Sequence, residues 1–342
     1  MNDVDPLHAV PELDLPPGWS ARPPGADDVP ALAELATSVL HAFRGEGRVE
    51  QETVAALVVG SGSWTRRQLV VLDADDRAQA WASVHDRAAG RTMVDLTVRP
   101  DLPEGDRVAA ALLAWMADVA RAVAVLRQLG STQLDASPYA ADERLKRWLT
   151  GAGYAKKRTW LHLTRPVDDA DGLPGPREGV VVRRVAKHDD GQPVAADIQV
   201  VHLMLEESFA DHFNSYRESF PEFVQRLRED PGHRWDHWWV AEVEVEGQLV
   251  PGGALVASVL GEDASGHHGS YVEYIGVHRR ARGRGVAKAL LHTVIKDAHE
   301  RGRNRVDLEV DADSPTGADG LYTSMGWTLD HVTESWHGEV TV

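Results

Sequence analysis

The chain has 342 residues, 43% of them hydrophobic and 26% charged, which is the composition of a folded protein with room for two domains. A formal net charge of -17 argues against broad non-specific binding of nucleic acid, because such binding depends on cations that neutralise phosphates. The absence of cysteine excludes disulfides, thiolate metal sites and cysteine nucleophiles. We therefore expect a cytoplasmic protein with no metal, no signal peptide and no membrane-spanning segment.

The first half of the sequence predicts alternating helices and strands from its apolar periodicity. In chain order these are helices 28–43 and 50–60, strands 68–75, 78–86 and 91–100, a long helix with apolar residues from Val108 to Ala120, strand 131–137, helix 142–154 and strand 156–166.

The second half predicts the same order of elements. It reads as strand 180–187, helix 195–209, a shorter helix over 220–229, strands 237–247, 248–260 and 269–277, a helix beginning at 286, strand 305–313, a short helix over 316–326 and a closing pair of strands. Val98 and Val277 occupy corresponding positions 179 residues apart. We therefore predict two tandem α/β domains, 1–164 and 180–342, joined by a linker over 165–179 that is rich in Pro, Gly and Asp.

The stretch "VHRRARGRGVAKALL" lies between a β-branched strand and an apolar-faced helix. A strand, a glycine loop and a helix start aim backbone N–H groups at an anion, and arginine adds donors that match phosphate oxygens. The sequence contains neither GxxxxGK[ST] nor GxGxxG. The hypothesis is a pyrophosphate site, and its alternatives are a solvated turn or a nucleic-acid patch. The residues of this loop are Arg282, Gly283, Arg284, Gly285, Val286 and Ala287.

The segment "RGRGVA" resembles the acetyl-CoA signature of the GNAT acetyltransferases, and "DADSPTGADGLYTSMGW" is similar to the motif that closes that family's domain. The tandem arrangement resembles actinobacterial proteins of the mycothiol synthase type. The resemblance covers the C-terminal domain by motif and the N-terminal domain only by order of elements. It implies two domains that each have a central mixed, mostly antiparallel sheet with helices on both faces, and acetyl-CoA as cosubstrate.

The resemblance also implies roles for individual residues. The backbone of Ile275, Gly276 and Val277 would hold the acyl-pantetheine arm. Tyr322 would protonate the leaving thiolate, with a buried core tyrosine as the alternative. Ser314 stands where many relatives have a cofactor-binding Asn.

The candidate general base is Glu273, because strand alternation places it on the face of Ile275 and Val277. Some relatives carry their glutamate two residues earlier, where this chain has Tyr271. A structural carboxylate is the alternative reading of Glu273. The acidic segment with Glu206, Glu207, Asp211 and His212 is expected to wall the acceptor site or to be a solvated helix end.

The N-terminal copy of the loop lacks the groups that this chemistry needs. Its glycine pair is reduced to Gly105, which Glu104 and Asp106 flank, and these carboxylates would repel a pyrophosphate. Leu149 occupies the position that corresponds to Tyr322. We expect a degenerate domain that packs against the active one.

The resulting hypothesis is an acetyl-CoA-dependent N-acetyltransferase that acts on a primary amine of a small molecule through its C-terminal domain. The alternatives are a non-catalytic CoA-binding regulatory or scaffold protein and a protein or peptide N-acetyltransferase. Expected partners are a small-molecule amine, with no nucleic acid and no membrane, in a monomer or homodimer.

Overall fold

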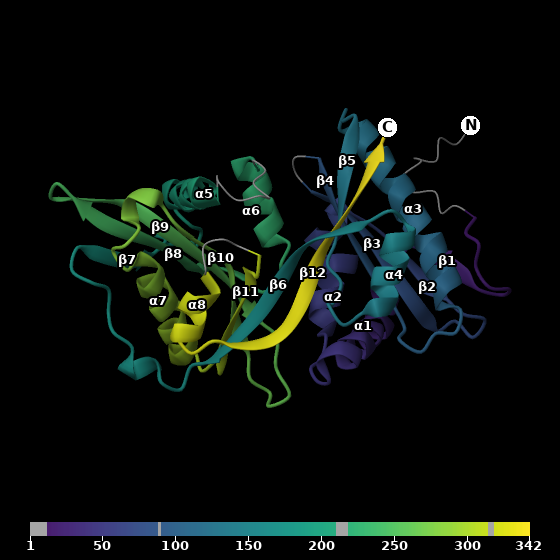
Figure 1. Cartoon of the computed structure of the whole chain (residues 1–342), viewed down its shortest axis with the longest axis horizontal. Coiled ribbons are helices and arrows are strands. Elements are labelled where there is room, and N and C mark those ends of the chain that lie inside the picture. The colour runs from purple at the N-terminus through teal and green to yellow at the C-terminus, as the bar shows by residue number, and fades with distance from the viewer. Residues whose placement is uncertain (1–11, 88–89, 210–217, 314–317) are drawn as a thin grey trace. The chain divides into compact units, whose positions relative to one another are not determined.

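The structure of the protein is a computed structural model that describes residues 12–87, 90–209, 218–313 and 318–342 (Figure 1). The chain divides into two compact units whose ranges are discontinuous in sequence. Unit 1 comprises Met1–Leu161, Asp311–Thr316 and His331–Val342, and unit 2 comprises His162–Val310 and Gly317–Asp330.

Unit 1 is built around a mixed sheet in the order β1-β2-β3-β4-β5-β12-β6. Its strands are β1 (Ser20–Arg22), β2 (Arg66–Leu72), β3 (Ala78–Arg87), β4 (Arg91–Val98), β5 (Ser131–Ala136), the first part of β6 (Ala155–Pro166) and most of β12 (Thr328–Thr341). Its helices are α1 (Val29–Arg44), α2 (Gln51–Val58), α3 (Gly105–Leu126) and α4 (Glu143–Gly151), with short 3₁₀ turns η1 (Ala26–Asp28) and η2 (Ser61–Thr65).

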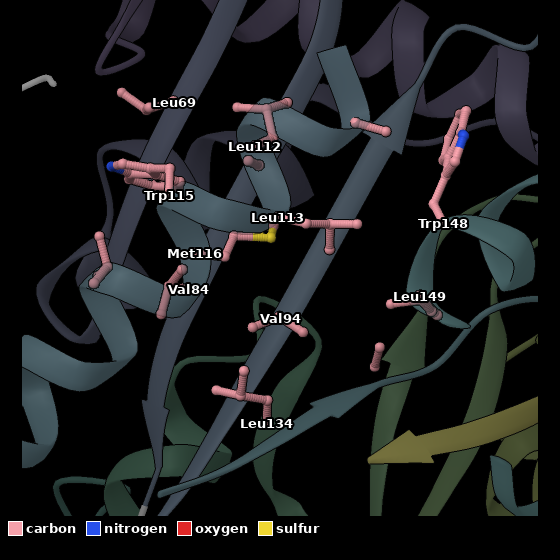
Figure 2. Packing of buried hydrophobic residues seen from close by; sticks show 14 of the residues in the cluster. Leu69, Val84, Val94, Leu112, Leu113, Trp115, Met116, Leu134, Trp148 and Leu149 are labelled. Atoms are coloured by element: carbon pink, nitrogen blue, oxygen red, sulfur yellow. The ribbon is translucent and has the colours of Figure 1, made fainter. Parts of the chain in front are cut away.

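Helix α3 is long and apolar enough to cross a membrane by length and composition, which the sequence analysis did not anticipate. One face of this helix instead forms the core of unit 1. Figure 2 shows Leu112, Leu113 and Met116 of α3 packed near Val94 of β4 and Leu134 of β5. The helix is therefore explained as the core helix of a globular unit.

Unit 2 has its sheet in the order β6-β11-β10-β9-β8-β7. It contains the second part of β6, the strands β7 (Val180–Arg184), β8 (His233–Val245), β9 (Gln248–Leu260), β10 (Gly269–Val277) and β11 (Arg305–Asp311), the helices α5 (Ala195–Phe209), α6 (Phe220–Arg228), α7 (Val286–Glu300) and α8 (Ala318–Ser324), and the 3₁₀ turns η3 (Ala170–Gly172) and η4 (Arg279–Ala281).

Helices cover both faces of the sheet in unit 2, as Figure 1 shows for α5 and α7. A Cβ on Gly276 of β10 would lie 2.9 Å from the Ser208 side chain of α5. A Cβ on Gly253, in the neighbouring strand, would lie 2.9 Å from Val286 of α7. These close approaches assign Gly276 to the α5 face and Gly253 to the α7 face. The predicted α/β class, with a mixed sheet between helices, is confirmed.

Each unit contains a parallel pair of strands that separates early. In unit 2, β10 and β11 pair only from Gly269 to Val272, although β10 continues to Val277. In unit 1, β4 and β5 pair from Arg91 to Met93, although β4 continues to Val98. Beyond these points, one edge of β10 and one edge of β4 have no partner strand in the part of the chain that the structure describes, and this opening is the starting point for the site.

The two units exchange strands that the sequence analysis placed differently. The predicted closing pair of strands is the single strand β12, and its residues Trp336–Thr341 pair with β5 of unit 1. Residues 162–166 of β6 and the expected linker belong to unit 2. Within that linker, Val167 and Ala170 are buried, so the segment packs against unit 2 for part of its length.

A test of the core in unit 1 is the substitution Leu112→Ala. Leu112 is fully buried in the α3 cluster, so we expect a loss of about 3 kcal/mol of unfolding free energy from the lost burial and the cavity left behind. Val125→Ala, on an exposed residue of the same helix, is the control and should cost less than about 0.5 kcal/mol. Urea unfolding measures both, and equal losses would contradict this packing.

Candidate active site

The free edge of β10 consists of the backbone groups of Ile275 and Val277. The N–H of His278 donates to the carbonyl of Gly252 in β9, so the backbone groups of His278 and Gly276 point toward β9. The groups of Ile275 and Val277 therefore point to the other side, where the ladder with β11 has ended. The missing Cβ of Gly276 makes room for Ser208 of α5.

The predicted phosphate loop leads directly from this edge to the start of α7. Gly283 and Gly285 have φ angles of +78° and +85°, a conformation that favours glycine. Gly285 is the N-cap of α7 and provides no side-chain cap, and the first turn of the helix has no acidic residue. The N–H groups of Val286 and Ala287 thus begin a helix whose dipole favours an anion.

The arginines of the loop divide into different roles. Arg284 donates from Nη1 to the carbonyl oxygen of Glu244 at 2.6 Å, so it braces the loop against the end of β8. Arg282 is exposed, and the contacts of the described residues give its side chain no partner. Arg282 is therefore the loop arginine whose side chain is most available to bind an anion.

Arg177 was missed by the sequence analysis because it lies in the expected linker. Its Cδ and Nε would lie 3.0 Å and 3.1 Å from a Cβ on Gly285, so its side chain crosses the N-terminus of α7. This side chain is exposed and has no hydrogen-bond or ion-pair partner among the described residues. Only a tertiary contact between segments far apart in the sequence reveals it.

Glu273 lies on the opposite face from the one predicted. A β-bulge between Val272 and Tyr274 inserts Glu273 as an extra residue in β10. The Ser258 hydroxyl in β9 donates to Oε1 of Glu273 at 2.6 Å, so the carboxyl lies on the face covered by α5 and α6. The expectation that Glu273 shares the face of Ile275 was wrong, because strand alternation cannot anticipate a bulge.

The Glu273 carboxyl is strongly shifted toward its protonated form. Burial raises the pKa of Glu273 to about 7, and the hydrogen bond from Ser258 offsets part of that effect. The nearby carboxyl of Asp230 raises this pKa further, whereas the cation of Arg226 lowers it. A carboxyl that titrates near neutrality is suited to accept and release a proton.

An aromatic cluster lies on the same face as Glu273. The Arg226 guanidinium lies 5.2 Å from the ring centroid of Tyr274, and both Nε and Nη2 of Arg226 donate to Glu218. Trp235 lies 5.1 Å from Trp238, between ring centroids. Charged and aromatic groups thus surround the carboxyl on the α6 side.

Tyr322 is held on α8 in a buried position. Its ring meets Trp327 edge-on, with ring centroids 5.8 Å apart, and burial raises the pKa of its phenol. The phenol therefore stays protonated at neutral pH and can donate a proton. Its hydroxyl has no hydrogen-bond partner among the described residues, and no described hydrogen bond or ring contact joins it to Glu273.

Glu207 and His278 connect the predicted acceptor wall to the loop. The Nε2 of His278 lies 2.8 Å from Oε2 of Glu207 on α5, and its Nδ1 accepts from the backbone N–H of Arg280. Glu206 lies 3.8 Å from His202. The predicted residues Ser314, Asp211 and His212 lie outside the described residues.

The corresponding loop of unit 1 is filled by its own side chains. Arg144 of α4 donates to the carbonyl oxygens of Val98, Arg99 and Pro100. Asp106, in the first turn of α3, accepts from Trp148 Nε1 at 2.6 Å. The carbonyl oxygens that follow β4 are thus occupied, and the Asp106 carboxylate stands in the first turn of α3, where it would repel a pyrophosphate.

A cavity of about 170 Å³ remains beside β4 in unit 1. It is lined by apolar side chains of β4, α3 and α4, together with polar ones that include Asp95, Thr97 and Arg144. Leu149 also lines it, where a tyrosine would be needed for proton donation. Within the described part of the chain, no group of His, Asp and Glu has the arrangement of a metal site.

The raised pKa of Glu273 gives a prediction for stability. Because the folded state binds this proton more tightly than the unfolded state, whose Glu pKa is near 4.5, stability should fall as pH rises from about 4.5 to about 7. Glu273→Gln should remove this pH dependence. Its free energy of unfolding should therefore rise relative to that of wild type by up to about 3 kcal/mol from pH 5 to pH 8. Urea unfolding at both pH values measures this.

Glu300→Gln is the matched control for that prediction, because Glu300 is exposed at the end of α7. It should show the same difference from wild type at pH 5 and at pH 8. An equal response of both variants would contradict a buried, protonated Glu273.

Comparisons with known proteins agree with this geometry. The model of the acetyltransferase (GNAT) family matches residues 204–327, which contain the bulge, the loop and Tyr322. An acetyltransferase of Pectobacterium atrosepticum is 36% identical over 110 residues, which cover 32% of this chain and 67% of the relative.

Two solved structures share the arrangement over nearly the whole chain. A GCN5-related N-acetyltransferase from Sphaerobacter thermophilus has a TM-score of 0.73 and 24% identity, covering 96% of this chain and 98% of its own. A tandem GNAT protein from the clavulanic acid biosynthesis pathway has a TM-score of 0.64 and 16% identity, covering 94% and 98%. The free strand edge, the helix N-terminus and the sequence match over this region together show that the chain belongs to the GNAT acetyltransferase family.

Proposed function

We propose that the protein is an acetyl-CoA-dependent N-acetyltransferase that acetylates a primary amine of a small molecule in unit 2. The observation that carries this proposal is the free backbone edge of Ile275 and Val277, which leads into a helix N-terminus without acidic residues. An extended chain with amide groups fits such an edge, and a pyrophosphate fits the helix start. Acetyl-CoA has both parts.

The proposed reaction is a direct transfer. The acceptor ammonium gives a proton to the ionised carboxylate of Glu273, directly or through water, and the free amine nitrogen attacks the thioester carbonyl carbon. A carbon–nitrogen bond forms, the carbon–sulfur bond breaks, and the nitrogen loses its second proton to solvent. The phenol of Tyr322 protonates the leaving thiolate, and the resulting phenolate takes a proton back from solvent.

The acceptor is proposed to be a cationic amine. The Glu273 carboxyl lies on a face with further acidic groups, including Asp230, and the chain as a whole is strongly acidic. Negative potential raises the local concentration of a cationic substrate. The mycothiol synthase type, a cytoplasmic location, a monomer or homodimer, and independence from metal, nucleic acid and membrane remain parts of this proposal.

Binding of acetyl-CoA tests the first step with the full-length chain. Isothermal titration calorimetry should give one site per chain, because Arg144 and Asp106 occupy the corresponding loop in unit 1. Arg177→Ala should weaken binding roughly 10-fold by removing a cation that lies across the start of α7. Arg228→Ala, on exposed α6 at the opposite face of the sheet, should leave the affinity unchanged.

No binding to the full-length chain would overturn the proposal, and two equal sites would overturn the silence of unit 1. Binding without transfer to any member of an amine library, followed by mass spectrometry, would favour the non-catalytic alternative. Transfer only to peptides would favour the protein-acetylating alternative.

Tyr322→Phe tests the acid role. Removing the phenol hydroxyl should lower kcat about 100-fold, with little change in the KM for acetyl-CoA, because the proton is needed only as the thiolate leaves. Tyr154→Phe is the matched control, since Tyr154 is a buried tyrosine of unit 1. An undiminished kcat in Tyr322→Phe would refute this role and leave the reaction itself standing.

A further inference from the structure

We propose that Asp230 is a positioning residue for Glu273, and that the two carboxyl groups share one proton. The catalytic meaning of this pair rests on the proposed function, whereas the pair itself is a property of unit 2. Asp230 stands in the turn between α6 and β8, a segment that the sequence analysis left without a role.

The geometry begins with the turn that holds Asp230. The N–H of Gly232 donates to Oδ1 of Asp230 at 2.6 Å, which fixes one carboxyl oxygen. The N–H of Val259 in β9 donates to the carbonyl of Gly232 at 2.9 Å, which ties the turn to the sheet. A Cβ on Gly232 would lie 2.2 Å from the Val259 carbonyl oxygen, so only glycine permits this approach.

The same part of β9 holds Glu273. Ser258 precedes Val259 and donates to Oε1 of Glu273 at 2.6 Å. The carboxyl groups of Asp230 and Glu273 are consequently brought within hydrogen-bonding reach of each other. Two carboxylates in such contact repel one another, and a single proton between them turns that repulsion into a hydrogen bond.

Few cations on the surrounding elements offset the negative charge of the Asp230–Glu273 pair. Arg226 of α6 acts on Glu273 and is already bonded through two nitrogens to Glu218, while Arg234 acts on Asp230. Glu309 of β11 raises the pKa of Glu273 further when it is ionised, and burial raises the pKa of Glu309 itself.

Three further side chains on this face contribute no charge at neutral pH. His233 of β8 is neutral there, because burial lowers its pKa to about 4. Tyr271 of β10 stays protonated, because burial raises its pKa. Phe209 of α5, which meets the ring of Tyr274, has no charge.

The shared proton has a consequence for the reaction. With one proton the pair has one negative charge, which attracts an ammonium group without the cost of two buried carboxylates. When the acceptor ammonium gives a proton to Glu273, the pair becomes neutral, and the proton returns to solvent after the amide forms. Asp230 therefore adjusts the pH at which Glu273 can accept this proton.

Carbon-13 NMR of the side-chain carboxyl groups tests the pair in the full-length protein without any substrate. Glu273→Gln assigns the Glu273 resonance, which should titrate near pH 7 in wild type. Asp230→Asn should lower that midpoint by at least about one pH unit, because the repulsion is lost and an amide can donate. Ser258→Ala should raise it, because the carboxylate loses a donor.

Asp189→Asn is the control, since it makes the same chemical change on an exposed residue of unit 2 and should leave the midpoint in place. Wild type alone supplies a second measurement if Asp230→Asn does not fold. The resonance of the Asp230 carboxyl, assigned by sequential backbone correlations, should then also respond to the titration near pH 7, as two coupled carboxyls must.

A Glu273 midpoint that does not move in folded Asp230→Asn, or an Asp230 resonance that is silent near pH 7, would overturn the pair. If an amine is acetylated, the acid limb of kcat/KM should move in Asp230→Asn by the same interval as the NMR midpoint. If the protein is active but the two carboxyls titrate independently, the pair is refuted and the proposed function stands. If the two carboxyls are coupled but the protein acetylates no amine, the proposed function is refuted and the pair stands.

Discussion

The early end of the parallel ladder between β10 and β11 is the constraint on which the site depends. Parallel strands that stayed paired would use the backbone groups of Ile275 and Val277 for the sheet itself. Their separation leaves one edge free and lets the chain turn through Gly283 and Gly285 into α7. The bulge at Glu273, just past the last paired residue, then directs a carboxyl to the opposite face. The edge of β10 is thus free for a ligand, while the side chain of Glu273 lies on the face covered by α5 and α6.

Sequence alone was sufficient for features that depend on neighbouring residues. The glycines of the loop, the apolar face of α7 and most strands follow from local periodicity, and they are found at the predicted places. The face of Glu273 could not be predicted, because a bulge is set by register against β9. Arg177 and Asp230 could not be predicted either, because their importance comes from contacts with Gly285 and Glu273, which are distant in sequence.

The two units share an architecture but differ in the groups that follow the parallel pair of strands. Both have the early separation of a parallel pair, but in unit 1 Arg144 occupies three carbonyl oxygens that follow β4. The Asp106 carboxylate stands in the first turn of α3 and accepts from Trp148. In unit 2 the first turn of α7 has no acidic residue. A fold match over the whole chain therefore does not assign chemistry to both halves.

The exchange of strands determines the order in which the protein can fold during synthesis. Unit 1 needs residues 331–342 for the strand next to β5, yet these residues follow the whole of unit 2 in the chain. The ribosome therefore completes unit 2 before unit 1 can close its sheet. Until then β5 presents an unpaired edge, which is a site for wrong pairing with other chains. The half that we propose to be catalytically silent is thus the last to be finished.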